Sequence, residues 1–507
     1  MKVVAGIDVG GTNTDAVLVR DGSIVERLKV PTTGDVRDGI LAALALVKQD
    51  YRIERVHIGT TAFTNALVER RNLESAAAIR VGSPVSESLP PMIDWPDDLR
   101  RAVKNESFMV AGGREYDGRP IRPIDRTEIS AIAKSLAARG IRQAAVTAVF
   151  GTSHPDDELQ VAQWLRGENA ELQVTLSHRI GRFGILEREN ATLLNAMLRP
   201  LAERTVAGFR AAVPANLFIS QNDGTAMRAD SAAQLPIFTV ASGPTNSLRG
   251  AGILASLDDA IVIDVGGTTT DVGVLRGGYP QAAGLELSIA GVRTNFRMPD
   301  LCSIGVGGGS LIDVATGAVG PHSVGFRLTA EALVFGGSQL TLTDIAVAAG
   351  RAEIGDRALV RHLDPELIAR VDDHLRRRLS RLLENYDRLD LRLPIVLVGG
   401  GAPLILHLLR DLGRQVESPN DAAVANAYGA AMAQVGGEAD LTFPSSVPRT
   451  EALAQAEAEA HRRAEQAGAR PGTTRTVELE DAALTYLASE ALQVHARAVG
   501  DIGEARE

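Results

Sequence analysis

The stretch IDVGGTTTD at residues 263–271 differs at one position from the stretch IDVGGTNTD at residues 7–15. In each copy an aspartate ends a short apolar run, two glycines follow, and hydroxyl or amide side chains lead to a second aspartate. A β-branched apolar run before paired glycines predicts a strand that ends in a tight turn, and the residues after the turn predict a returning strand. Because one hairpin occurs twice, the sequence predicts two structurally related lobes.

Both glycine turns are suited to binding phosphate groups. Successive backbone N–H groups in such a turn form an anion-binding concavity, and glycine lets a ligand approach the backbone closely. A carboxylate would repel a phosphate, so we expect Asp8 and Asp264 to hold a hydrated Mg²⁺ against it. A single copy would be equally well explained as a plain hairpin, but two copies with the same flanking aspartates favour phosphate binding. Neither copy is followed by GK[ST] or contains G-x-G-x-x-G, which excludes a Walker A loop and a Rossmann fingerprint.

The residues around the first copy predict an α/β fold. Residues 3–9, 15–20 and 23–30 have the pattern of three strands, residues 36–48 that of a helix, and residues 56–71 that of a strand followed by a helix. A third glycine cluster, VLVGGGAP at 396–403, again follows an apolar run, and this strand end is suited to packing against a flat ring such as adenine. Together the three clusters predict a nucleotide cleft between the lobes.

The rest of the chain continues the α/β pattern with two additions. Residues 82–125 are rich in turn residues and are interpreted as an insertion or a substrate-side subdomain. Residues 420–437 predict a helix of small residues that ends at Gly436-Gly437, and the tail from about residue 448 predicts a helix and then a hairpin. The expected domains are a first lobe over 1–190, a second lobe over 191–437 and a C-terminal extension over 438–507.

Composition limits the classes of function. The 507 residues suggest two to four globular units at roughly 150 residues each. The net charge of −10 argues against nucleic acid as a partner, and the single cysteine excludes a disulfide framework and a cysteine-based metal cluster. The first residues become glycine-rich before a signal-length apolar region develops, and the chain has no run of about 18 apolar residues. We therefore expect a soluble, cytoplasmic protein with no membrane partner.

The glycine clusters resemble the two phosphate loops and the adenosine loop of the actin, heat-shock-chaperone and sugar-kinase ATPases. More narrowly, the chain resembles the ATP-binding A subunit of the hydantoinase/oxoprolinase family, whose motifs occur here in order over nearly the whole length. The stretches that carry this resemblance are HIGTTAFTNALVERR (57–71), LERENATLLNAMLRP (186–200), SGPTNSLRGAG (242–252), SIGVGGGSLIDV (303–314), TLTDIAVAAGR (341–351) and ARAVGDI (496–502).

The resemblance implies two actin-like (ribonuclease H-like) lobes around a nucleotide cleft, with ATP and Mg²⁺ as cofactors. It implies ATP-dependent phosphorylation of the carbonyl oxygen of a cyclic amide or imide, such as a hydantoin, oxoproline or lactam, for ring opening with a B-type hydrolytic subunit. Self-association into a homo-oligomer is left open. A small-molecule kinase and a non-catalytic ATPase switch of the same superfamily are the alternatives.

The resemblance also assigns roles to residues. Asp8 and Asp264 would hold Mg²⁺, Asp15 or Asp271 would orient the loops, and Thr60 and Thr61 would face the transferred phosphoryl group. Phosphates would contact the first turn (Gly10, Gly11, Thr12, Asn13), the second turn (Gly266, Gly267, Thr268, Thr269) and the loop at Gly307 and Gly308. Adenine would pack on Gly399, Gly400 and Gly401.

The chain departs from the family pattern where a substrate would be recognised. The family's GP-x-S-x-GADPGPACYG segment is represented by GPHSVGFRLTAEALVFGG at 320–337, and the 82–125 region lacks the usual GF-x-D pattern. The chain is also shorter than the A subunits of that family. Substrate identity therefore does not follow from the sequence.

Several other residues have two interpretations. Cys302 is a small core residue or a nucleophile, and His57 is a buried strand residue or a base. His154 and His178 do not form a recognisable metal set. Asp313 and Asp344 are helix caps or contacts of the ribose or metal shell, and Glu189 and Asn190 cap a helix or line the interlobe cleft.

Overall fold

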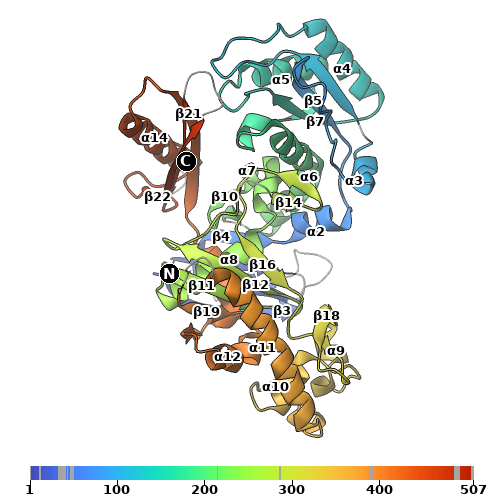
Figure 1. Cartoon of the computed structure of the whole chain (residues 1–507), viewed down its shortest axis with the longest axis vertical. Helices are drawn as coiled ribbons and strands as arrows, with labels where there is room; N and C mark the ends of the chain where they lie inside the picture. The colour runs from blue at the N-terminus through green and yellow to red at the C-terminus, as the bar shows by residue number, and fades with distance from the viewer. Residues whose placement is uncertain are drawn as a thin grey trace.

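The computed structural model describes residues 2–10, 13–31, 41–42, 44–45, 51–104, 106–213, 215–284, 287–387, 392–484 and 491–503. Its larger sheets have nine, six and four strands and are arranged along an elongated molecule (Figure 1). The first lobe is built on the nine-stranded sheet and the second lobe on the six-stranded sheet. Most of the helix predicted at 36–48 lies outside the described residues.

The first lobe contains the predicted opening hairpin. Its strand order is β22-β23-β21-β10-β9-β4-β1-β2-β3. The strands are β1 (Lys2–Val9), β2 (Asn13–Arg20), β3 (Ser23–Pro31), β4 (Arg52–Thr60), β9 (Asn216–Ser220), β10 (Ala226–Arg228), β21 (Val435–Pro444), β22 (Arg475–Leu484) and β23 (Ala491–Gly500). Helix α2 (Ala62–Glu69) follows β4, as predicted, with Thr61 at its N-cap.

The second lobe repeats the arrangement of the first. Its strand order is β13-β12-β11-β19-β20, and β16 also pairs with β12. The strands are β11 (Ala260–Val265), β12 (Thr270–Arg276), β13 (Tyr279–Pro280), β16 (Leu301–Ile304), β19 (Ile395–Val398) and β20 (Val416–Glu417).

The register of the two hairpins confirms the internal repeat. Asp8 pairs with Asp15 in the antiparallel β1–β2 ladder, and Asp264 pairs with Asp271 in the antiparallel β11–β12 ladder. A parallel strand lies on the other side of each first strand, β4 beside β1 and β19 beside β11. The predicted α/β fold of two related lobes is therefore confirmed.

The region expected as an insertion over 82–125 is part of a larger unit. Four parallel strands in the order β6-β5-β7-β8 form its sheet, and α4 and α5 belong to it at the top of the view in Figure 1. The elements are β5 (Ala76–Ser83), β6 (Ser107–Ala111), β7 (Gln143–Ala148), β8 (Gln173–Leu176), α4 (Arg126–Ala138) and α5 (Asp156–Glu168). The turn-rich segments that link β5 to β6 and β7 were predicted. Strand β5 itself, which begins before those segments, was not.

The expected boundaries at 190 and 437 do not separate sheets. Helix α6 (Ile185–Ala212) runs through position 190, and β21 runs through position 437. The predicted helix end at Gly436-Gly437 is wrong, because α13 (Ala425–Ala431) ends earlier and both glycines lie in β21. A Cβ on Gly437 would collide with the backbone of α14 (Arg449–Ala467), so glycine allows that helix to lie directly on the strand.

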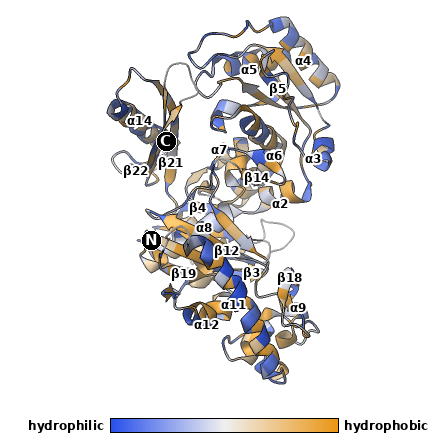
Figure 2. Ribbon diagram, viewed as in Figure 1, coloured by the Kyte–Doolittle hydropathy of each residue, from blue (hydrophilic) through white to orange (hydrophobic). Residues whose placement is uncertain are grey.

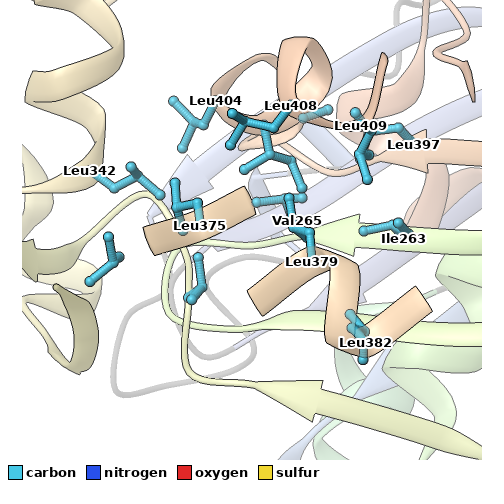
Figure 3. Close-up of a cluster of buried hydrophobic side chains, with 14 of the residues drawn as sticks. Ile263, Val265, Leu342, Leu375, Leu379, Leu382, Leu397, Leu404, Leu408 and Leu409 are labelled. Atoms are coloured by element: carbon cyan, nitrogen blue, oxygen red, sulfur yellow. The ribbon is translucent and has the colours of Figure 1, made fainter. Parts of the chain in front are cut away.

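The core of the second lobe lies between its sheet and three helices. Helix α11 (Pro365–Asp387) buries leucines at helical spacing, among them Leu375, Leu379 and Leu382, while its outer face is hydrophilic (Figure 2). Figure 3 shows these leucines against Ile263 and Val265 of β11, with side chains of α10 (Leu342–Ala348) and α12 (Ala402–Asp411) closing the cluster. This apolar layer packs β11 of the second hairpin against α12, which follows the Gly399–Gly401 loop. In the described part of the chain, no helix is long and apolar enough to span a membrane.

Candidate functional site

A cavity of about 580 Å³ lies where the two hairpins face each other. Its volume is within the range of small-molecule and cofactor sites. Of the predicted site residues, those that line it are Asp8, Gly10, Asn13, Asp15, Thr61, Asp264, Gly266, Gly267, Thr268, Thr269, Asp271, Gly308, Gly399, Gly400 and Gly401. Gly11 and Thr12 lie outside the described residues. The structure thus brings together residues that are up to about 390 positions apart in sequence.

The two glycine turns have the same hydrogen bond. Gly10 N–H donates to the carbonyl of Asn13 at 3.1 Å, and Gly266 N–H donates to the carbonyl of Thr269 at 2.9 Å. Each turn therefore closes in the same way between its two strands. The cleft is lined by one such turn from each lobe, as the sequence repeat predicts.

The loop at 307–309 forms backbone hydrogen bonds with the second turn. Gly308 N–H donates to the carbonyl of Gly266 at 3.0 Å, and Gly309 N–H donates to the carbonyl of Gly267 at 2.7 Å. A Cβ on Gly307 would overlap the backbone of Gly267 and Thr268. Gly308 lines the cavity, whereas Gly307 serves close packing between the two loops.

The third glycine loop lies against Asp264. Gly401 N–H donates to the carbonyl of Val265 at 2.8 Å, which ties the start of α12 to the end of β11. Gly399 has a φ of +89°, and a Cβ there would collide with the Asp264 carboxylate. Glycine is therefore required at this position both for its backbone conformation and for the space beside the carboxylate.

Asp8 is buried and held by two amide side chains. Asn246 donates from Nδ2 to Oδ1 of Asp8 at 3.3 Å, and Asn426 donates from Nδ2 to Oδ2 at 3.1 Å. Asn426 also donates to Asp15 at 2.8 Å, and Lys29 donates to Asp15 at 2.6 Å. Burial, and then the charge of Asp15, raise the pKa of Asp8 to about 6 despite these donors.

Asp264 is half-buried on the opposite side of the cleft. Burial raises its pKa to about 6, and the charges of Asp271 and Asp8 add to the effect, while a hydrogen bond from Ser247 opposes it. Burial also raises the pKa of Asp271, whose carboxylate accepts a hydrogen bond from Ser303. The four carboxylates of the cleft are therefore only partly compensated, by Lys29 beside Asp15.

This donor set fits a divalent cation. Four carboxylates line the cavity, and Lys29 is the one lysine or arginine among the described lining residues. The raised pKa values of Asp8 and Asp264 show that both ionised groups are unfavourable without a further cation. Oxygen ligands of this kind suit Mg²⁺, which binds through one or two carboxylates and keeps several waters.

The sequence analysis missed Lys29, Asn246 and Asn426. Lys29 could have been found from the hairpin register, because β2 and β3 place it directly opposite Asp15. Asn246 lies on α8 (Ser242–Ala255), and Asn426 lies on α13. Their contact with Asp8 depends on a crossing of these helices that no local pattern indicates.

The two predicted threonines differ in position. Thr61 lines the cavity, and its backbone N–H donates to the carbonyl of Val9 at 3.4 Å. Thr60 is 2% exposed, and its hydroxyl accepts a hydrogen bond from Ala62 N–H at 3.2 Å. The geometry therefore favours Thr61 as the one that can meet a ligand.

Comparison with known proteins agrees with this architecture. The hydantoinase/oxoprolinase N-terminal region matches residues 4–169, and the hydantoinase/oxoprolinase domain matches residues 188–360. The chain belongs to the hydantoinase/oxoprolinase family. The predicted family is thereby confirmed.

Two curated relatives share part of the chain's sequence. The chain is 27% identical over 393 residues to the acetophenone carboxylase gamma subunit of Aromatoleum aromaticum, an alignment covering 68% of this chain and 52% of the relative. It is 26% identical over 391 residues to the caprolactamase subunit alpha of Pseudomonas jessenii, covering 68% of this chain and 54% of the relative. The chain thus aligns with about half the length of these curated relatives.

The fold is shared with a solved structure. The ATP-dependent caprolactamase from Pseudomonas jessenii superposes with a TM-score of 0.76 at 17% identity, covering 99% of this chain and 88% of that chain. At that identity the likeness shows the fold.

The remaining histidine and cysteine candidates lie outside the cleft. His57 is buried on β4, stacked on Phe218 at 5.2 Å, and burial and then Arg55 lower its pKa to about 3, so the ring is neutral. His154 contacts the carbonyl of Tyr116 at 3.1 Å, and His178 contacts Glu158 at 2.7 Å. Cys302 is half-buried on β16, where burial raises its pKa and favours the thiol form.

The acidic candidates have structural partners. Asp344 forms a capping box with Thr341 at the start of α10 and is therefore a helix cap. Asp313 accepts a hydrogen bond from Thr316 N–H at 2.9 Å in an exposed turn. Glu189 is paired with the fully buried Arg80 of β5.

Asn190 likewise holds elements together. It accepts a hydrogen bond from the Trp95 indole at 2.7 Å and donates to the carbonyl of Arg293 at 2.9 Å. Glu189 and Asn190 therefore attach α6 to the four-stranded unit and to neighbouring loops.

Proposed function

We propose that this protein uses ATP to phosphorylate the carbonyl oxygen of a cyclic amide or imide. The observation that carries the proposal is the pair of phosphate-type turns with Asp8 and Asp264 on opposite sides of one cavity. Relatives named for caprolactam hydrolysis and for ketone carboxylation support a carbonyl compound as the second substrate.

In the proposed reaction the amide oxygen attacks the γ-phosphorus of ATP, the bond to the β-phosphate oxygen breaks, and ADP leaves. The product is an imidate phosphate. Water then adds to the activated carbon, and the ring C–N bond breaks as the nitrogen takes up a proton, which leaves an acyl phosphate. A second water hydrolyses the acyl phosphate to a carboxylate and free phosphate, so the product is an amino acid or an amide that carries the new carboxylate. Phosphorylation makes the amide carbon a much better electrophile. The first step therefore removes most of the barrier to ring opening.

The chain's own residues would position the nucleotide. Backbone N–H groups of the turns at Gly10–Asn13 and Gly266–Thr269 would contact phosphate oxygens, and Thr61 would face the transferred group. Adenine would pack on Gly399–Gly401. Asp8 and Asp264 would hold Mg²⁺, which neutralises charge on the phosphates when bound. Asn246 and Asn426 keep the Asp8 carboxylate in one orientation.

The hydrolytic step is assigned to a partner of the B-subunit type. The two relatives described above are named as subunits, which supports an assembly of more than one chain. The carboxylase relative favours a second candidate, in which the same cleft phosphorylates the oxygen of an open-chain ketone in its enolate form.

Positional isotope exchange tests the first step without the partner. ATP carrying ¹⁸O in the β,γ-bridge is incubated with Mg²⁺ and each compound from one panel of cyclic amides and one panel of ketones. Scrambling of the label that depends on one compound class identifies the substrate class, and Asp8→Asn is the inactive control. If calorimetry shows Mg²⁺-dependent ATP binding but no carbonyl compound causes scrambling or ADP release, the phosphoryl-transfer proposal is wrong. If ATP does not bind, the nucleotide site itself is wrong.

A further inference from the structure

A second cavity, of about 220 Å³, lies between the C-terminal extension and the four-stranded unit. Residues 178–182, the β9–β10 turn, Phe296-Arg297 and β21 line it. We call it the arginine pocket. It is separated from the nucleotide cleft by the start of α8. On the pocket side Gln221 accepts a hydrogen bond from Thr245 at 3.0 Å, whereas Gly243 and Pro244 line the cleft.

His178 lines this pocket, and only one of its two ring nitrogens is hydrogen-bonded to the described residues. Its Nδ1 lies 2.7 Å from Oε2 of Glu158, and its backbone N–H donates to the same oxygen at 3.1 Å. Because a carboxylate can only accept, Nδ1 carries the proton and donates it. Among the described residues, none forms a hydrogen bond with Nε2, and the side chain is 17% exposed.

Glu158 is well suited to orient this histidine. It is fully buried on α5, and its Oε1 accepts hydrogen bonds from Ala148 N–H at 3.0 Å and from the Ser177 hydroxyl. Burial alone would raise its pKa, but the hydrogen bond from His178 and the charge of Arg188 hold the pKa below its usual value. Glu158 is therefore ionised and satisfied, and the imidazole is held in one tautomer and one orientation.

The charge around His178 favours an anion. Five arginines and three carboxylates line the pocket, and two of the arginines, Arg297 and Arg463, pair with Glu478 and Glu459, which do not line it. The carboxylates are already paired with arginine: Arg182 lies 2.8 Å from Glu438 and 3.8 Å from Asp440, and Arg497 lies 3.3 Å from Asp223. A metal ion at these carboxylates would therefore have to displace an arginine.

Arg179 is the remaining arginine of the pocket. It is exposed, and among the described residues it has no hydrogen-bond or ion-pair partner. Part of the side chain is still covered by the protein, and this partial desolvation, followed by the charges of Arg199 and Arg166, lowers its pKa, as expected for a cation without a nearby counter-ion. It lines the pocket next to His178.

The pocket also has an apolar wall. Phe238 and Phe296 both line it, with ring centroids 6.2 Å apart at an angle of 70°. Aromatic side chains opposite a few convergent polar groups are typical of small-molecule sites, in which the apolar part of the ligand is buried and the polar groups fix its orientation.

We propose that the arginine pocket binds a small organic oxyanion, a carboxylate or phosphate on an apolar body. Its oxygens contact Arg179, Arg182 and the Nε2–H of His178, whose ring takes up a second proton when the anion binds. The apolar body lies against Phe238 and Phe296. The site is distinct from the nucleotide cleft and does not depend on the function proposed for it. This role for His178 was not predicted from the sequence, in which the histidine was considered only as part of a metal set with His154.

Calorimetric titration of the full chain tests the proposal with three probes. Benzoate and phenyl phosphate carry the two oxyanions, and benzamide is the uncharged control of similar shape. We expect one or both anions to bind and benzamide to bind at least tenfold more weakly. His178→Gln and Arg179→Gln should each weaken the anion roughly tenfold. His154→Gln, a histidine of the same unit outside the pocket, should not.

The variants separate this site from a folding defect and from the cleft. Arg179 is exposed and unpaired, so its replacement leaves the packing intact. Mg²⁺–ATP affinity should be unchanged in all three variants. Absence of binding by both anions, or equal affinity in the parent, His178→Gln and Arg179→Gln, would overturn the proposal. Binding of phenyl phosphate alone would assign the site to phosphate compounds, and of benzoate alone to carboxylates.

Discussion

Replacing Asp264 by asparagine is expected to stabilise the nucleotide-free protein and at the same time to slow its chemistry. The pKa of Asp264 rises from 3.8 to about 6 on folding, mainly because of burial. Each pKa unit corresponds to about 1.4 kcal/mol, so the ionised group opposes folding by about 3 kcal/mol at neutral pH. Asp8 and Asp271 share this repulsion, which reduces the part that one substitution can recover to about 1–3 kcal/mol.

The pH dependence has a definite sign. Between pH 3.8 and about 6 the folded protein binds a proton at Asp264 that the unfolded chain has lost. The free energy of unfolding therefore rises as the pH falls from about 7.5 to about 5. Asp264→Asn removes this contribution, so the variant should be more stable than the parent at the higher pH and should gain less on acidification.

The same substitution should lower kcat by roughly a hundredfold or more, because a metal-positioning carboxylate acts mainly in the transition state. ATP affinity should change much less, since most nucleotide contacts are proposed to come from the glycine loops. A variant that lowers turnover while raising stability separates a functional role of Asp264 from a structural one.

Thermal unfolding with a chelator present, at about pH 7.5 and about pH 5, measures the first effect. A gain of 1–3 kcal/mol corresponds to a few degrees in the midpoint for a domain of this size. Asp373→Asn, at an exposed position of α11, is the matched control. A midpoint for Asp264→Asn that is equal to or below that of the parent at the higher pH, or unchanged turnover with saturating substrates, would refute the reasoning.

Three further substitutions test the surrounding structure. Asp8→Asn should reduce turnover as strongly as Asp264→Asn, measured by steady-state ADP release, and normal turnover would contradict its place in the repeat. Gly429→Ala should weaken Mg²⁺–ATP binding in calorimetry, because a Cβ there would collide with the Asn246 carbonyl and push α13 and α8 apart; unaltered affinity would show that this crossing does not position Asp8. Arg80→Met should destabilise the chain by about 3–5 kcal/mol in urea unfolding by leaving Glu189 buried and unpaired, and the added change Glu189→Leu should restore much of the loss; equal stability of the single and double variants would contradict this.

The parts of the fold that could be predicted are those specified locally. Each hairpin is specified by an apolar run, a glycine turn and a returning strand, so the pairing of Asp8 with Asp15 and of Asp264 with Asp271 follows from a few adjacent residues. The glycine turn also fixes which atoms face the cleft. For this reason the residues expected there are largely found along one cavity.

The parts that could not be predicted depend on contacts between distant segments. Asn246 and Asn426 meet at Asp8 because α8 and α13 cross closely, with Gly250 against the Ala425 carbonyl. Neither helix shows this in its own pattern. Likewise, the start of β21 has the pattern of a helix end, and it is a strand because it pairs with β10 and β23. Its partner in β10 is about 200 positions away in sequence, and its partners in β23 are about 50 to 65 positions away.

The repeat is symmetrical in its backbone but not in its charges, and the difference concerns how a cation would be held. In the first lobe Asp8 accepts two amide hydrogen bonds, and Lys29 compensates the adjacent Asp15. In the second lobe Asp264 and Asp271 are assisted by serine side chains, which carry no charge. Amide and ammonium donors orient the first carboxylate pair before any ligand arrives. Burial nevertheless raises the pKa of Asp8 and of Asp264 alike, to about 6. A divalent cation between the lobes would therefore relieve both carboxylates, and its binding would favour the arrangement in which Asp264 approaches the first lobe around Mg²⁺ and ATP.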